Sequence, residues 1–129
     1  MSVKLNHTIV HSRDMHAAAR FFAEIFDRPP PTRFGPFLVV QVDNEVSLDF
    51  LDADGGPAPQ HYAFLVSEAQ FDRIFERLQA RGIAYWADPG KREKSAINRH
   101  FGGRGLYFED PSAHLLEIIT RPYGRWEDL

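Results

Sequence analysis

The pattern of apolar and polar residues in the first half of the chain predicts a strand, a helix and three further strands. Alternation with period two over residues 3–11 is typical of a strand that has His7 on one face and Val10 on the other. Apolar residues then recur at helical spacing, and this stripe consists of Met15, Ala18, Ala19, Phe22, Ile25 and Phe26. Three antiparallel strands are expected next, at residues 32–35, 37–42 and 46–51.

Residues that start and stop helices lie at both ends of this apolar stripe. Ser12 or Asp14 can cap the amino terminus of the helix, because a short polar side chain there accepts hydrogen bonds from free amides. The three prolines at 29–31 end the helix, because proline cannot supply the amide that the helical ladder needs.

The second half of the chain repeats this order of elements. A strand is expected at residues 61–66, followed by a capping-box candidate that begins at Ser67 and ends at Gln70. The helix that follows has an apolar stripe made of Phe71, Ile74, Phe75 and Leu78. Gly82 is a suitable carboxyl-terminal cap for it. Strands are then predicted at residues 83–87, 105–109 and 114–120.

Together the two halves predict an α+β fold with an internal repeat of pattern. Each half forms a βαβββ module, module one at about 1–57 and module two at about 58–129, within a single domain of residues 1–129. The turn-forming stretch at 52–59 is the natural joint between them. We expect a cup-shaped mixed sheet with the helices on its outer face.

Composition removes several classes of function. The chain has 129 residues, a formal net charge of −3 and a pI of about 6.0, which gives no sign of a nucleic-acid or anionic-membrane partner. Cysteine is absent, so disulfides, thiolate metal sites and cysteine nucleophiles are excluded. The first 20 residues lack an apolar signal segment, and no apolar stretch reaches membrane-spanning length, so a cytoplasmic protein is expected.

Four residues occupy matching places in the two halves. His7 and His61 each open the first strand of a half, whereas Asp49 and Glu117 lie in the last strand of each. If the halves pack about a pseudo-twofold axis, these side chains converge. Two neutral imidazoles and a carboxylate with open positions beside them suit a redox-active or Lewis-acidic divalent metal.

The matching places of these residues decide between two interpretations of the histidines and the acid. On the alternative interpretation His7 and His61 are capped core histidines and Glu117 lies on an exposed sheet face, or pairs with a buried arginine. Any one of these residues alone favours that alternative, but all three at matching points of a repeat favour a metal site. Asp49 is a candidate fourth ligand with a shorter reach than glutamate.

These modules resemble the vicinal oxygen chelate superfamily, which includes glyoxalase I, extradiol dioxygenases, fosfomycin-resistance transferases and bleomycin-binding proteins. The segment GGRGLYFEDPSAHLLEI at 102–118 is similar to the strand-turn-strand signature of that superfamily. The stretch INRHFGGRGLYFEDP, together with EIITRPYG, also resembles the small dioxygenases of aromatic polyketide pathways such as chartreusin biosynthesis. The resemblance covers nearly the whole chain.

The resemblance implies metal ligands at His7, His61 and Glu117, with the further acid of glyoxalase I at or near Asp49. It implies an Fe(II) dioxygenase, with Mn, Ni or Zn as other metals, that acts on an aromatic or polyketide-like small molecule chelated through adjacent oxygens. The alternatives are a glyoxalase-type isomerase or resistance-type transferase, and a metal-free antibiotic-binding protein. A homodimer is implied as well, because many relatives pair.

Other residues are candidates for contact with a substrate. Tyr107 should point into the cup and is a candidate proton donor. The charged loop at about 88–104 is either a lid that attracts an anionic or phenolate substrate or a solvated surface loop. Its candidate substrate contacts, with one possible pocket wall for a flat ligand, are Arg99, His100, Arg104 and Trp86.

Overall fold

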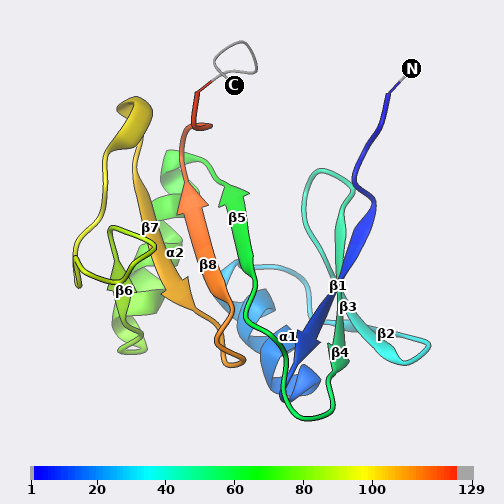
Figure 1. Cartoon of the computed structure of the whole chain (residues 1–129). Coiled ribbons are helices and arrows are strands. Elements are labelled where there is room, and N and C mark those ends of the chain that lie inside the picture. The colour runs from blue at the N-terminus through cyan, green and yellow to red at the C-terminus, as the bar shows by residue number, and fades with distance from the viewer. Residues whose placement is uncertain (1, 125–129) are drawn as a thin grey trace. The chain divides into compact units, whose positions relative to one another are not determined.

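The computed structural model describes residues 2–124, which form two compact units (Figure 1). The first unit contains the chain as far as Pro59 together with Asp110–Ser112. The second unit contains Gln60–Glu109 and the chain from Ala113 onward. The break after Pro59 falls at the end of the turn-rich stretch that the sequence indicates as a joint.

The first unit consists of a four-stranded mixed sheet and one helix. Its strand order is β1-β4-β3-β2, in which β1 and β4 run parallel and the other pairs are antiparallel. The elements are β1 (His7–Ser12), α1 (Met15–Ile25), β2 (Thr32–Phe34), β3 (Phe37–Gln41) and β4 (Ser47–Asp52).

The second unit has the same topology. Its strand order is β5-β8-β7-β6, again with the first pair parallel and the others antiparallel. The elements are β5 (His61–Leu65), α2 (Glu68–Ala80), β6 (Tyr85–Trp86), β7 (Gly105–Glu109) and β8 (Leu115–Ile119), with a short 3-10 turn at His100–Gly102. The predicted α+β class and the repeat of the βαβββ order are therefore confirmed.

The helix α1 forms where the apolar stripe predicts it. Asp14 caps its amino terminus, where its carboxylate accepts hydrogen bonds from the amides of His16 and Ala17. Asp52, at the end of β4, accepts a third from the amide of Met15 at 2.8 Å. The helix packs against β1, β3 and β4. Its buried residues, nearly all of them in the predicted stripe, are Met15, Ala18, Ala19, Phe22, Ala23 and Ile25.

The helix α2 is also capped by a short polar side chain and also buries an apolar stripe. Ser67 accepts a hydrogen bond from the amide of Gln70, as the capping-box pattern predicts. The residues that α2 buries are Phe71, Ile74 and Leu78. Gly82 follows the helix with a positive φ of 65°, a conformation that glycine adopts without steric cost.

Each sheet has one buried face and one open face, and strand alternation decides which residues lie on each. In β1, Val10 and Ser12 are buried, whereas His7, Ile9 and His11 on the other face are exposed, as the period-two pattern predicts. In β8, Leu116 and Ile118 are buried, whereas Glu117 between them lies on the other face. The open faces therefore carry the candidate chemistry.

Among residues 2–124, neither helix combines the length and the apolar character needed to cross a membrane.

Candidate metal centre

The two sheets place an acid at the same position relative to a histidine. In the first unit, Asp49 pairs in register with Ile9, two residues after His7. In the second unit, Glu117 pairs with Ala63, two residues after His61. Since residues two apart share a face of a strand, each acid lies on the same open face as its histidine. The pairing thus matches the symmetry that the sequence suggests.

His61 and Glu117 are in direct contact. The Nε2 atom of His61 lies 3.1 Å from Oε1 of Glu117. The other ring nitrogen, Nδ1, lies 3.0 Å from the backbone carbonyl oxygen of Leu115. A carbonyl oxygen only accepts hydrogen bonds, so Nδ1 carries the hydrogen and donates it. The carbonyl of Leu115 therefore fixes both the ring orientation and the tautomer.

This tautomer leaves a lone pair on Nε2 that faces a carboxylate. Two acceptors at that distance repel each other unless Nε2 takes up a proton or both atoms coordinate a cation. Two ligand bonds of about 2.1 Å at a right angle place their donor atoms about 3 Å apart, close to the separation seen here. A histidine whose second nitrogen donates to a carbonyl is also the usual arrangement at a metal. The pair therefore fits a divalent metal.

Tyr107 completes this cluster. It pairs in register with Glu117, and its ring stacks beside that of His61 with centroids 5.9 Å apart. Burial raises the pKa of Tyr107 to about 12; the Glu117 carboxylate adds to this by repelling the phenolate and by accepting the phenol hydrogen bond, and Asp88 adds a smaller repulsion. The phenol is thus held as a neutral donor toward Glu117.

His7 lies on the open face of the first sheet. Its Nδ1 is 2.7 Å from Oδ1 of Asn6, an amide oxygen that accepts a hydrogen bond and leaves Nε2 available. Asp49 is half-buried on the same face and accepts a hydrogen bond from the Ser47 hydroxyl at 3.0 Å. In both units, then, Nδ1 of the histidine is bonded to an oxygen; Nε2 of His61 faces Glu117, and Nε2 of His7 is the nitrogen left to act as a ligand.

The structure brings together only part of the predicted constellation. His61, Glu117 and Tyr107 form one cluster, whereas His7 and Asp49 belong to the first unit. Among residues 2–124, no group of three or more His, Asp or Glu side chains is placed to hold a metal ion. The ligand set His7, His61 and Glu117 stays a prediction.

The predicted substrate contacts lie in different surroundings. Trp86 pairs with Tyr107 across β6 and β7, so its ring is on the open face. Arg99 and His100 are exposed at the start of the 3-10 turn. Arg104 lies two residues before the buried Leu106 and therefore faces α2.

Arg104 is fully engaged on that side of the sheet. Its guanidinium pairs with Glu68 and Asp72, each at 2.8 Å, and lies 4.3 Å above the ring of Phe71. These partners raise the pKa of Arg104, Asp72 most of all, and hydrogen bonds lower the pKa of Glu68. In this structure Arg104 joins β7 to α2, and its predicted contact with a substrate stays a prediction.

Two groups in this cluster were not identified from the sequence. Asp88 is close enough to Tyr107 to influence its pKa, but it lies in a loop where no periodic pattern indicates direction. The carbonyl of Leu115 orients His61, and a backbone acceptor has no side-chain signature. The parallel pairing of β5 with β8 could have suggested it, because that pairing sets residue 115 beside residue 61.

Comparison with known proteins places the chain in a family. A model of the Glyoxalase/Bleomycin resistance protein/Dioxygenase superfamily matches residues 4–118. The structure of Oxidase ChaP-H1 is 57% identical with a TM-score of 0.94, and the match covers 96% of this chain and 100% of that one. Oxidase ChaP-H2 is 56% identical with the same TM-score and covers 96% and 98% of the two chains.

Two curated proteins are more distant relatives. Glutathione transferase FosA of Serratia marcescens is 30% identical over 125 residues, which cover 92% of this chain and 81% of that protein. Metallothiol transferase FosB of Shouchella clausii is 26% identical and covers 90% and 79%. The chain belongs to the glyoxalase, bleomycin resistance protein and dioxygenase superfamily, so the resemblance drawn from the sequence is confirmed.

Proposed function

We propose that this member of the superfamily is a metal-dependent oxygenase, with Fe(II) as the metal and an aromatic or polyketide-like substrate that binds through adjacent oxygens. The observation that carries the proposal is the His61–Glu117 pair in a chain 57% identical to an oxidase. The name of the relative FosB, a metallothiol transferase, adds support for a metal.

In this proposal His7, His61 and Glu117 hold the metal, and Asp49 is a candidate fourth ligand. Two histidines and one carboxylate form the ligand set that non-haem Fe(II) oxygenases use, with open positions beside it. Iron bound there supplies Lewis acidity toward a phenolic oxygen and electrons for dioxygen. Mn, Ni or Zn would supply the Lewis acidity alone.

The protein's own groups have defined tasks in the reaction. The carbonyl of Leu115 accepts the hydrogen of Nδ1 and so orients the His61 ring with Nε2 toward Glu117. Tyr107 donates a hydrogen bond to Glu117, and its raised pKa of about 12 keeps the proton on the phenol at neutral pH. If Glu117 binds the metal, the phenol can turn this hydrogen bond from Glu117 to a substrate oxygen on which negative charge develops. Trp86 supplies a flat apolar surface on the same face.

Oxygen uptake by reconstituted protein tests the oxygenase proposal. Metal-free protein is loaded with Fe(II), Mn(II), Ni(II) or Zn(II) without air, and oxygen consumption is then followed with 2,3-dihydroxynaphthalene as an adjacent-oxygen probe. We expect uptake with iron, abolished in Glu117→Gln and strongly reduced in Tyr107→Phe. His16→Ala is the matched control, because His16 is an exposed residue of α1. Equal uptake in Glu117→Gln and the unaltered protein would contradict the proposal.

Metal-dependent transfer or isomerisation is the second candidate, favoured by the 30% identity with a glutathione transferase. If this second candidate is correct, the protein should consume thiol, measured with glutathione and an epoxide, only when Mn(II) or Zn(II) is bound. Oxygen uptake should then be absent. His7→Ala separates both enzyme readings from a metal-free binding protein. If the variant loses metal but still binds the aromatic probe unchanged, the chain is a binder with an incidental metal.

We also propose that the protein is a homodimer and that it acts in the cytoplasm on a small molecule. The likeness to a superfamily whose members act on small molecules supports a small-molecule partner. Sedimentation at several protein concentrations tests the oligomeric state, and a single monomeric species throughout would contradict a dimer.

A further inference from the structure

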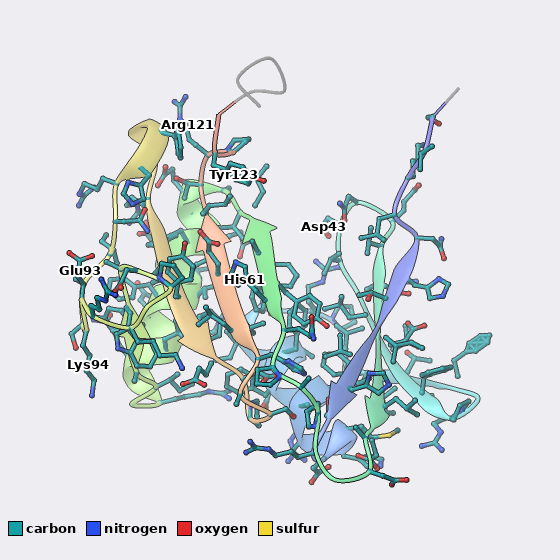
Figure 2. All side chains as sticks on the ribbon, viewed as in Figure 1. Asp43, His61, Glu93, Lys94, Arg121 and Tyr123 are labelled. Carbon is teal, nitrogen blue, oxygen red and sulfur yellow. The ribbon has the colours of Figure 1, made fainter. Side chains whose placement is uncertain are left out.

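The loop that follows β6 folds back onto that strand. Lys94 forms an isolated bridge with Trp86, and the amide of Ser95 donates to the carbonyl of Tyr85 at 2.9 Å. The amide of Ala87 donates to the carbonyl of Glu93 at 3.0 Å. Figure 2 shows Glu93 and Lys94 on this loop, beside β6 in Figure 1. The loop is therefore fixed against the edge of the second sheet.

A carboxylate inside the loop fixes the turn at its tip. Asp88 accepts hydrogen bonds from the amides of Arg92 and Glu93 at 2.9 Å and 2.8 Å. These amides, that of Glu93 most of all, lower the pKa of Asp88 and keep it ionised. Lys91, which lies between Asp88 and Arg92 in the chain, has a φ of 57°, in the left-handed region that non-glycine residues rarely adopt. Such a conformation persists only where its surroundings hold it.

The turn places the ammonium group of Lys91 on the open face of the second sheet. Its Nζ lies 3.0 Å from Oε1 of Glu109 and 5.7 Å from the centroid of the Trp86 ring, within cation–π range. Glu109 is two residues after Tyr107, and Trp86 pairs directly with Tyr107, so all three share one face. This is the face that carries His61 and Glu117.

The partner of Lys91 can be exchanged for a ligand. The side chains of Lys91 and Glu109 are 41% and 34% exposed, so water and small molecules reach both. An ion pair this exposed is weak because solvent screens it. A ligand that presents a carboxylate or phenolate to the ammonium and lays its ring against Trp86 makes both contacts, whereas Glu109 makes only the ionic one.

We propose that Lys91 and Trp86 form a subsite for the anionic end of an aromatic substrate, with Glu109 as the group that the anion displaces. Lys91 is thereby a specificity-determining residue. The inference rests on the proposed function in one respect only, that the substrate binds on the face that carries His61 and Glu117.

Binding of two matched aromatics to metal-free protein tests the subsite. The probes are 1-hydroxy-2-naphthoate, an anion at neutral pH, and 1-naphthol, which is neutral; affinities are measured by calorimetry in EDTA without oxygen chemistry. For Lys91→Met we expect naphthoate to bind about three to ten times more weakly, and 1-naphthol to change less than about twofold. Lys91→Arg should restore most of the naphthoate affinity. Lys94→Met, a nearby exposed lysine, is the control.

Glu109→Gln gives the sharpest test, because it should change the naphthoate affinity in the direction opposite to Lys91→Met. Removing the competing carboxylate should strengthen naphthoate binding by about two- to threefold, which a purely structural ion pair would not do. Trp86→Leu should weaken both probes. Each of three results would overturn the proposed subsite. Lys91→Met could weaken both probes equally, or Glu109→Gln could bind naphthoate more weakly. The unaltered protein could also fail to bind naphthoate at all. None of these binding measurements requires bound metal or oxygen consumption. The subsite proposal and the oxygenase proposal can therefore fail independently of each other.

Discussion

Replacing Tyr107 with phenylalanine should make the free energy of unfolding fall less steeply as the pH rises into the alkaline range. Burial first and Glu117 second raise the pKa of Tyr107 to about 12 in the folded protein, whereas an unfolded tyrosine has a pKa of about 10. Between these values the unfolded chain has released the phenolic proton and the folded chain has kept it. The contribution of Tyr107 to stability is therefore complete below the unfolded pKa and is lost as pH rises toward the folded one.

The difference between the two pKa values sets an upper limit on this effect. At about 1.36 kcal/mol per unit of pKa, it corresponds to at most about 2.7 kcal/mol. Tyr107 keeps partial contact with water. Because solvent screens the charges around it, we expect a loss of about 1 kcal/mol.

Urea unfolding of EDTA-treated protein between about pH 8 and about pH 11 measures the effect. We expect the unfolding free energy of the unaltered protein to fall more steeply with pH than that of Tyr107→Phe. Tyr123→Phe is the control, because Tyr123 is 66% exposed. Parallel pH profiles for the unaltered protein and Tyr107→Phe would refute the argument.

Glu117→Gln tests the cause of the shift in the same metal-free protein. The substitution removes the charge that repels the phenolate, but burial, the largest cause, remains. The titration of Tyr107 is followed by ultraviolet absorbance and isolated by subtracting the spectrum of the matching protein with Tyr107→Phe. The pKa of Tyr107 should therefore fall in Glu117→Gln but stay above the ordinary value of a tyrosine. An unchanged titration would show that Glu117 does not act on Tyr107.

Three further predictions concern stability and are each checked by urea unfolding. Asp14→Ala removes the cap of α1 and should cost about 1 kcal/mol, whereas Asp14→Asn should keep most of it. Leu106→Ala, at a fully buried position, should cost about 2–5 kcal/mol. Gly103→Ala would place a Cβ 2.7 Å from the Thr120 hydroxyl oxygen and should cost about 1–3 kcal/mol. Losses near zero would contradict the contacts that each prediction uses.

Strand alternation and capping were sufficient to predict most of the fold. The open and buried faces of β5 and β8 follow from period two alone, so the face that carries His61 and Glu117 was predicted correctly. Asp14 and Ser67 cap the helices as short polar residues before an apolar stripe do. These features depend on local sequence, which is why the pattern contains them.

Strand ends depended on pairing that the pattern does not contain. The first strand was expected over residues 3–11 but begins at His7, because its partner β4 begins at Ser47. The strand expected at 83–87 is only Tyr85–Trp86, because its register with β7 consists of those two residues.

Some site contacts also depend on tertiary structure. The position of Lys91 against Glu109 follows from a loop turn that Asp88 fixes, and no periodicity predicts it. Arg104 could have been assigned to the helix side, because it lies two residues before the apolar Leu106. The contacts of Arg104 with Glu68 and Asp72 required the packing of α2.

The metal content of protein purified without air tests the central claim most directly. Elemental analysis should find close to one iron per chain in the unaltered protein and in the control His16→Ala. His7→Ala, His61→Ala and Glu117→Gln should each lose it, because each removes one of the three proposed ligands. Iron retained in His61→Ala, or no metal in the unaltered protein even after reconstitution with Fe(II), would contradict the account.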